Sequence, residues 1–115
     1  MARMNARHKF NAKPTVVDNI RFASQKEARR YQELKLLERA GEVKDIEIQP
    51  EFRLTVVGGF VKDVIKEIGC YRADFTYWDK ARGRVVEDVK GFKTPLYRWK
   101  KKHVEAQYGI TIREV

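Results

Sequence analysis

Two segments rich in aromatic and β-branched residues, separated by a short polar segment, constrain the fold more than any other feature of this chain. They are Tyr71–Trp78 and Arg84–Lys90, and residues of these types favour strands. The polar residues between them are typical of the loop of an antiparallel hairpin. If that loop is centred on Ala81, Asp74 lies directly opposite Asp88, and a slip of one residue would break the match. The sequence therefore predicts two neighbouring carboxylates on adjacent strands.

The two opposed acids lead to a second prediction, a bound cation. Like charges directly opposite each other destabilise a hairpin by roughly 0.2–1 kcal/mol, so the pairing makes sense mainly when a positive charge lies between them. Oxygen ligands favour a hard ion, and we expect Asp74 and Asp88 to hold Mg²⁺, for which Mn²⁺ should substitute. Strand side chains alternate, so Lys90 should lie on the side of Asp88. This set suits metal-dependent phosphodiester chemistry; the alternative is two ordinary aspartates on a solvated sheet face.

Composition and charge bound the interpretation further. The chain has 115 residues, 43% of them hydrophobic, which suits one compact domain with a modest core. A net charge of +9 and a pI near 9.8 point to a polyanionic partner, for which DNA is the first candidate. No apolar run approaches the roughly 20 residues that span a bilayer, and no secretory signal is recognisable, so we expect a cytoplasmic protein with no membrane partner. Cys70 is the single cysteine, and we expect a buried structural thiol.

Periodicity along the chain predicts an α/β domain of the α+β kind over residues 18–115, preceded by a basic arm over residues 1–17. The arm has no acid and no periodic apolar face, so it either settles along a phosphate backbone or is a solvated tail. Besides the two strands above, the expected elements are a helix over Gln25–Ala40, a strand over Val43–Val57 interrupted at Gln49-Pro50, a hairpin through Gly58-Gly59 into Phe60–Ile68, a helix over Pro95–Tyr108 and a strand over Ile110–Val115.

Two polar residues have two interpretations each. Ser24 begins a capping box, in which Glu27 would satisfy the Ser24 backbone N–H, but a carboxylate in the first helical turn could also reach the metal site. Gln49 either approaches the same site or only bonds backbone beside the kink at Pro50. The sequence leaves both pairs of alternatives open.

The second predicted helix carries a run of cations soon after Lys90. No acid precedes Glu105 among Lys93, Arg98, Lys100, Lys101 and Lys102. Such a run is usually a solubilising face, but this one follows the two acids at once, and we expect it to contact DNA. The inner stripe of the helix should consist of Leu96, Trp99, His103 or Val104, and Tyr108.

The motifs together resemble the PD-(D/E)XK nuclease superfamily, whose core motif is an acid on one strand and acid-x-Lys on the next. The corresponding segments here are Ala73-Asp74 and Asp88-Val89-Lys90. Three further segments look like a family of small phage and prophage proteins related to Holliday-junction-resolvase-like and transposon-end nucleases: Phe22–Ala28, Gln49–Phe52 and Val86–Phe92. Ala73 replaces the proline of the motif, and because proline has no catalytic group the chemistry should be unaffected.

The resemblance implies a restriction-endonuclease-like core in the order helix, three-strand mixed sheet, helix, strand, with Glu27 as an added catalytic acid beside Asp74, Asp88 and Lys90. We therefore expect a Mg²⁺-dependent endonuclease in phage DNA recombination, repair or processing, in the host cytoplasm if phage-encoded. So short a chain has no separate reader of base sequence, which favours a DNA shape such as a junction, flap or end. Junction cutting would imply a homodimer. The alternative is a non-catalytic nucleic-acid-binding phage protein.

Overall fold

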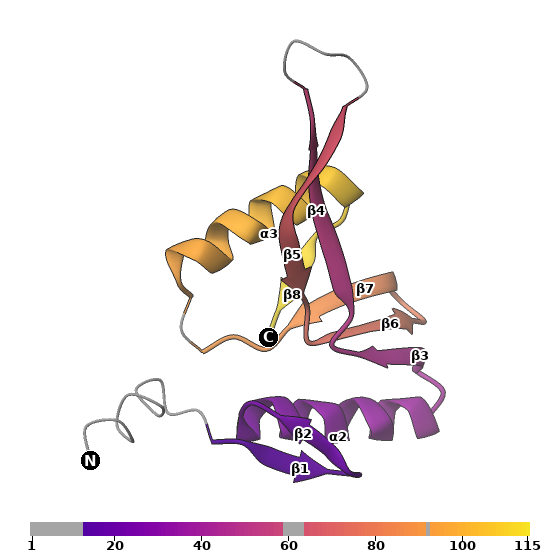
Figure 1. The fold of residues 1–115 in the computed structure, drawn as a ribbon. Helices are drawn as coiled ribbons and strands as arrows, with labels where there is room; N and C mark the ends of the chain where they lie inside the picture. Colours follow the sequence, from indigo (N-terminus) through magenta and orange to yellow (C-terminus); the bar gives the residue numbers. More distant parts are fainter. Residues whose placement is uncertain (1–12, 59–63, 92) are drawn as a thin grey trace, which may run out of the picture.

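The computed structural model describes residues 13–58, 64–91 and 93–115, which form an α+β fold (Figure 1). In chain order the elements are β1 (Thr15–Val17), β2 (Ile20–Phe22), α2 (Gln25–Arg39), β3 (Val43–Ile48), β4 (Glu51–Val57), β5 (Ile65–Arg72), β6 (Phe75–Asp79), β7 (Gly83–Asp88), α3 (Pro95–Tyr108) and β8 (Ile112–Glu114). Most of the predicted basic arm, the tip of the long hairpin from Gly59 onward and Phe92 lie outside the described residues. No helix within the described ranges is long and apolar enough to cross a membrane.

A four-stranded sheet in the order β3-β6-β7-β8 forms the centre of the fold. β3, β6 and β7 are antiparallel neighbours, and β8 joins β7 in parallel. The predicted hairpin of β6 and β7 is confirmed in its register, because Phe75 pairs with Glu87. The next step of that register sets Asp74 against Asp88. The turn is closed by Asp79, whose Oδ1 accepts two backbone N–H groups of the loop at 2.7 and 3.0 Å.

Two of the expected strands are each divided by a break, and the two breaks lie against each other. The expected strand Val43–Val57 is two strands in different sheets, because Gln49 has a left-handed φ of 54° and Pro50 has no N–H for a ladder. The expected strand through Asp74 divides at Ala73. Gln49 N–H donates to Asp74 O at 2.8 Å, and Ala73 N–H donates to Pro50 O at 3.1 Å. Asp74 therefore lies where the inserted strands rejoin the sheet.

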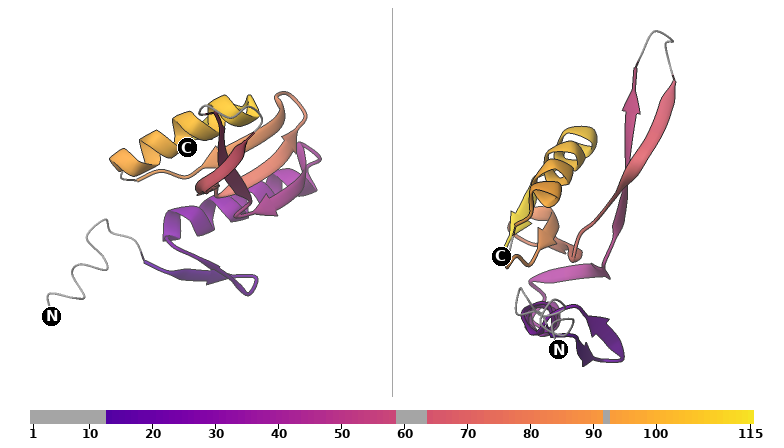
Figure 2. Two further views of the ribbon diagram at one scale, coloured as in Figure 1. Left: turned by 45° about the horizontal axis from the view of Figure 1, so that its top comes forward. Right: turned by 60° about the vertical axis from the view of Figure 1, so that its left-hand side comes forward.

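The inserted strands, β4 and β5, form an antiparallel ribbon that projects from the central sheet (Figures 1 and 2). The base of the ribbon is bound to α3 through Gln107, which accepts from Thr55 N–H at 2.9 Å and donates to Arg53 O at 3.0 Å. Cys70 is exposed on the ribbon, so the prediction of a buried thiol is wrong. Its neighbour Tyr71 is buried instead, because side chains of a strand alternate between faces.

Two apolar cores lie on opposite faces of the central sheet, one beside α2 and one beside α3. The core beside α2 consists of Phe22, Ala28, Tyr31, Leu34, Val43, Phe75, Tyr77, Val85 and Val89. The core beside α3 and the ribbon consists of Leu54, Tyr71, Ala73, Val86, Val104 and Ile112. Val85 and Val86 belong to different cores, as strand alternation requires. The same alternation sends Glu87 toward α2 and Asp88 toward the opposite face.

The two helices begin and end close to the predicted residues. α2 ends one residue before the expected Ala40, and α3 has the expected bounds. Ser24 Oγ accepts the Glu27 N–H at 3.1 Å, and Thr94 Oγ1 accepts the Tyr97 N–H at 3.0 Å, so both predicted N-caps are present. Gly109 ends α3 with a left-handed φ of 64°.

The inner stripe predicted for α3 is wrong for Leu96 and Trp99, whereas His103 Nε2 lies 2.9 Å from Thr55 O and Tyr108 OH donates to Arg53 O of the ribbon at 2.7 Å. Three of its expected members are exposed: Leu96 by 62%, Trp99 by 52% and Tyr108 by 43%. Val104 is buried, and Tyr97 packs against the same core. Tyr97 takes the inward place because its hydroxyl donates to Glu114 of β8 at 2.6 Å, which satisfies the polar end of a partly buried ring.

A short hairpin precedes α2 and packs against it. Its first strand, Thr15–Val17, lies within the predicted basic arm, so the expected boundary after residue 17 falls inside ordered structure. Asp18 and Asn19 have φ values of 52° and 63°, typical of a type I′ turn. Tyr31 OH donates to Asp18 at 2.9 Å, which ties this turn to α2.

Candidate metal and nucleic-acid site

Asp74 and Asp88 each bind backbone next to the other. Asp88 Oδ1 accepts the Asp74 N–H at 3.0 Å, and Asp74 Oδ2 accepts the Val89 N–H at 2.7 Å. One oxygen of each carboxylate is thus fixed by the neighbouring strand. The reciprocal bonds bring the two predicted acids together and restrict their rotation.

The second oxygen of Asp88, Oδ2, is buried and has no hydrogen-bond partner among the described residues. Asp88 as a whole is 1% exposed. Lys90 Nζ lies 3.7 Å from this oxygen, an ion-pair distance that is too long for a hydrogen bond. A buried carboxylate oxygen without a hydrogen bond is costly, and a metal ion bound in front of it would reduce that cost further than the distant ammonium does.

Lys90 is held beside Asp88 by contacts with both helices. Its Nζ lies 3.9 Å from the centroid of the Tyr97 ring, a cation–π contact with α3. Its backbone O accepts from Lys26 Nζ of α2 at 2.7 Å. The lysine therefore has a defined position next to the carboxylates, as the strand alternation predicted.

Glu27 belongs to the same group of charges. Its Oε2 accepts the Ala23 N–H at 3.3 Å and not the Ser24 N–H that a capping box would use, so this part of the prediction is corrected. Burial and the charge of Asp74 raise the pKa of Glu27 to about 7, while Lys90 acts in the opposite direction. A first-turn carboxylate can bind its own backbone and still sense the charges of the site.

Burial also raises the pKa values of both aspartates. The pKa of Asp88 rises to about 6, and Lys90 partly offsets the effect of burial. The pKa of Asp74 is raised as well, although the Val89 N–H stabilises its charged form. Burial thus disfavours the charged form of both carboxyl groups, and groups perturbed in this way are enriched at functional sites.

The donor set fits a hard divalent ion held by few protein ligands. Within the described residues, no group of three or more His, Cys, Asp or Glu side chains is placed to hold a metal ion. Mg²⁺ needs only one or two carboxylates and takes waters and phosphate oxygens in its other positions. Asp74 and Asp88 would be the two ligands, and such an ion would bind Asp88 Oδ2, which accepts no hydrogen bond from the described residues.

An ion pair that the sequence analysis missed lies on the other face of β7. Glu87 is fully buried and accepts from Arg30 Nε at 2.7 Å, from Arg30 Nη2 at 2.9 Å and from Tyr77 OH. The bonds to Glu87 raise the pKa of Arg30, and burial raises the pKa of Tyr77. The adjacent acids Glu87 and Asp88 were the available signal, because consecutive strand residues face opposite sides and one acid had to face the apolar side.

Glu114 of β8 neutralises part of the predicted basic face of α3. Lys93 Nζ lies 2.8 Å and Lys101 Nζ 3.4 Å from its carboxylate. Lys93, followed by the hydrogen bond from Tyr97, lowers the pKa of Glu114 to about 2. The acid follows the helix in sequence and is brought beside it because Glu114 pairs with Asp88 in the parallel register of β7 and β8.

Among the described residues, the other α3 cations predicted to contact DNA are not neutralised by a carboxylate. Arg98 and Lys102 are exposed and Lys100 is half-buried. Among the described residues these three make no ion pair, in contrast to Lys93 and Lys101.

A second group of cations, also missed, lies on α2. A hollow of about 330 Å³ is lined by Lys26, Arg29, Arg30, Glu33, Val89 and Val115. Lys26 and Arg29 are exposed, and Lys26 is the residue that binds the Lys90 carbonyl. Spacings of three and four residues from Lys26 were the sequence signal, because they place Arg29 and Arg30 on one face of the helix.

Gln49 meets the site through its backbone. Its N–H donates to Asp74 O, as expected for a backbone-bonding residue beside Pro50. A role for the Gln49 side chain stays a prediction.

Comparison with known proteins gave one match. No curated protein and no solved structure matches the chain. The family described as "Protein of unknown function (DUF1064)" matches residues 7–113, a range that includes every candidate site residue named above from Glu27 to Lys102. The chain therefore belongs to the DUF1064 family.

Proposed function

We propose that this protein is a metal-dependent endonuclease that hydrolyses DNA phosphodiester bonds. The observation that carries the proposal is the buried Asp88 Oδ2, which has no hydrogen-bond partner within the described residues and lies 3.7 Å from Lys90 Nζ. A solvated sheet face does not account for it, because Asp88 is 1% exposed. A metal ion held between Asp88 and Asp74 would account for the buried oxygen.

The roles of the residues follow from their positions. Mg²⁺, or Mn²⁺ in its place, would be held by Asp74 and Asp88 and would supply a water of lowered pKa and a polarised scissile phosphate. Lys90, steadied by the Tyr97 ring, would orient the attacking water or stabilise charge that develops on the phosphoryl oxygens. Glu27, with a pKa of about 7, would accept a proton from that water near neutral pH.

The order of the elements is compatible with the same proposal. When β1, β2, β4 and β5 are left out, the remaining elements follow the order helix, three strands, helix, strand that the sequence resemblance to PD-(D/E)XK nucleases implies. The ribbon of β4 and β5 would then be an insertion between the first two strands of that core.

DNA is the proposed substrate because exposed cations flank the acids on two sides. Lys26 and Arg29 lie on α2, and Arg98 and Lys102 lie on α3. Contacts with phosphates carry little sequence information, so we propose recognition of a junction, flap or end during phage DNA processing in the host cytoplasm. Symmetric cutting of a junction would need a homodimer, and the exposed apolar side chains of the ribbon, such as Ile65, could supply its interface.

The proposal is tested by cleavage of labelled linear, flapped, four-way and single-stranded DNA. Cleavage should require Mg²⁺ or Mn²⁺ and stop in EDTA. Asp88→Asn and Lys90→Ala should lose it by a factor of about 10² or more while still binding DNA. Asp45→Asn is the matched control, because Asp45 is exposed and its φ of 57° suits asparagine. Undiminished cutting by either site variant would refute the assignment.

A non-catalytic nucleic-acid-binding protein is the second candidate. The observation in its favour is that both aspartates already bind backbone N–H groups, which gives them a structural role without metal. Such a protein would bind DNA equally well with Mg²⁺ and with EDTA and would cut no member of the panel.

A further inference from the structure

A row of three side chains crosses the end of the central sheet that is remote from the aspartates. Lys44 of β3 pairs with Trp78 of β6, and Trp78 pairs with Arg84 of β7. Residues directly opposite each other on antiparallel strands share a face, so the indole lies between two cations. Arg84 Nη2 lies 3.4 Å from Thr76 Oγ1, a residue that faces the same side as Trp78 by strand alternation.

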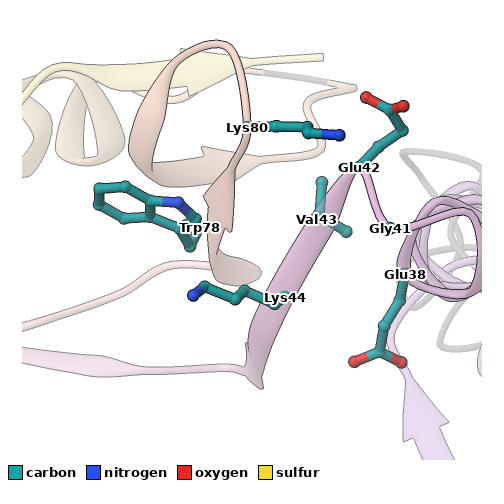
Figure 3. A pocket seen from close by; sticks show the side chains of 7 residues that line it. All are labelled: Glu38, Gly41, Glu42, Val43, Lys44, Trp78 and Lys80. Atoms are coloured by element: carbon teal, nitrogen blue, oxygen red, sulfur yellow. The ribbon is translucent and has the colours of Figure 1, made fainter.

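All three members of this row are exposed, and Trp78 is exposed by 47%. Figure 3 shows Trp78 and Lys44 extending in the same direction from their neighbouring strands, whereas the Glu38 and Glu42 carboxylates point away from the indole. These residues line a hollow of about 370 Å³ together with Gly41, Val43 and Lys80.

The Trp78 indole lies over Gly83, and the hollow beside it has Lys44 and Lys80 as well as Glu38 and Glu42 in its lining. A Cβ on Gly83 would lie 3.8 Å from the Trp78 ring, an ordinary van der Waals contact. A ring that already packs against its neighbour loses less freedom when a ligand stacks on it. Among the described residues, Lys44, Lys80 and Arg84 have no carboxylate partner, unlike Arg82, which lies 3.9 Å from Asp79.

We propose that Lys44, Trp78 and Arg84 form a second nucleic-acid contact, in which an unpaired base stacks on Trp78 and the adjoining phosphates bind the two cations. Aromatic side chains set among cations bind single strands in this way without sequence preference. A base inside a duplex has both faces stacked already. The ligand is therefore a single-stranded segment and not a continuous duplex.

The position of the row relates it to the candidate metal site. Trp78 and Asp74 lie four residues apart along the same chain segment, which corresponds to about 14 Å, close to four base steps of a strand that keeps duplex-like stacking. The inference rests on the nucleic-acid substrate proposed above and narrows it to DNA with a single-stranded part near the scissile bond, such as a flap or a frayed end. It does not depend on the metal chemistry.

Tryptophan fluorescence tests the inference directly, because the chain has two tryptophans. Trp99→Phe leaves Trp78 as the reporter, and Trp78→Phe leaves Trp99. The full chain is titrated in EDTA with oligothymidine and with a duplex of equal length. Oligothymidine should quench Trp78 and the duplex should quench it less. Trp78→Ala should weaken binding of the single strand by about 5- to 150-fold.

A charge reversal provides the second measurement. Arg84→Glu should weaken oligothymidine binding and reduce the magnitude of the negative slope of log K against log salt by at least about 0.7. Arg21→Glu is the matched control, since it reverses an exposed arginine on a strand outside the row, and it should change single-strand binding less. The inference would be overturned if oligothymidine did not quench Trp78 fluorescence, or if Arg84→Glu and Arg21→Glu lost single-strand affinity equally. If the protein cleaves DNA but Trp78 fluorescence is not quenched, only the proposed contact at Trp78 is refuted. If Trp78 fluorescence is quenched but no Mg²⁺-dependent cleavage occurs, only the nuclease proposal is refuted.

Discussion

Arg30 of α2 and Glu87 of β7 form a two-bond ion pair beneath the strand that carries Asp88, with N–O distances of 2.7 and 2.9 Å. Glu87 and Asp88 are consecutive, so one carboxylate faces the helix and the other faces the candidate metal site. The helix that supplies Arg30 also supplies Glu27. The ion pair therefore fixes α2, which carries Glu27, relative to β7, which carries Asp88, and it does so from the face of the sheet opposite the candidate metal site.

Removing one partner of this pair should be strongly destabilising. Arg30→Ala leaves Glu87 charged and buried, and the expected loss is about 3–5 kcal/mol of unfolding free energy. Urea unfolding followed by circular dichroism measures it. Glu33→Ala removes the exposed partner of Arg30 and should cost less than about 1 kcal/mol. Equal losses in the two variants would contradict the structural role given to Glu87.

The register of β6 and β7 was predictable because a short polar loop and strict alternation leave one pairing that buries the apolar side chains. The division of the longer strands was harder to predict, since it depends on the left-handed backbone of Gln49 and on hydrogen bonds between two breaks distant in sequence. The pattern Gln49-Pro50 indicated a kink. It did not indicate that the chain leaves the sheet there.

The orientation of α3 and the charge balance around it could not be inferred from the helix sequence. Leu96 and Trp99 satisfy helical periodicity as well as Tyr97 does, and Tyr97 faces inward because Glu114 and Lys90 meet it there. Glu114 comes from a strand that follows the helix. Its neutralisation of Lys93 is therefore a property of the tertiary structure.

The metal-free protein should lose stability as the pH rises through the range in which Asp88 ionises. Its pKa is raised from 3.8 to about 6, so the folded state binds more protons than the unfolded state between these values. This contribution is fully present below pH 3.8 and is lost as the pH approaches 6, on the order of 1–3 kcal/mol. The charge of Lys90 lowers the pKa of Asp88, and the charge of Glu114 raises it. In EDTA, Tm measured against pH should fall less steeply for Asp88→Asn than for the wild type.

Mg²⁺ should reverse that loss. An ion that binds only the folded state raises its stability by about 2.7 kcal/mol at a hundred times Kd, which corresponds to an increase of several degrees in Tm. Differential scanning fluorimetry at pH 8 should show this increase for the wild type and for Asp45→Asn. Asp88→Asn should show no increase, and a shift equal to that of the wild type would exclude Asp88 as a ligand.

Cys70 should react with a thiol reagent in the native state. It lies exposed on the ribbon, so the reagent needs no unfolding to reach it. Titration with a chromogenic disulfide should modify one thiol per chain at a rate that is insensitive to low urea concentrations. A thiol that reacts only after denaturation would show that another surface covers the ribbon in solution.

The cations of α3 should contribute unequally to DNA binding. Arg98 and Lys102 are exposed, so each Ala variant should reduce the magnitude of the negative slope of log K against log salt by about 1 for a duplex. Lys101 lies 3.4 Å from Glu114, and binding a phosphate would require it to give up that partner, so Lys101→Ala should change the slope less. Fluorescence anisotropy in EDTA, from low to moderate salt, measures all three.

Glu114→Gln frees Lys93 and Lys101 and should increase affinity for DNA, because two cations that were neutralised within the protein become available to the DNA backbone. Equal slopes for Lys101→Ala and Lys102→Ala would mean that DNA displaces Glu114 on binding.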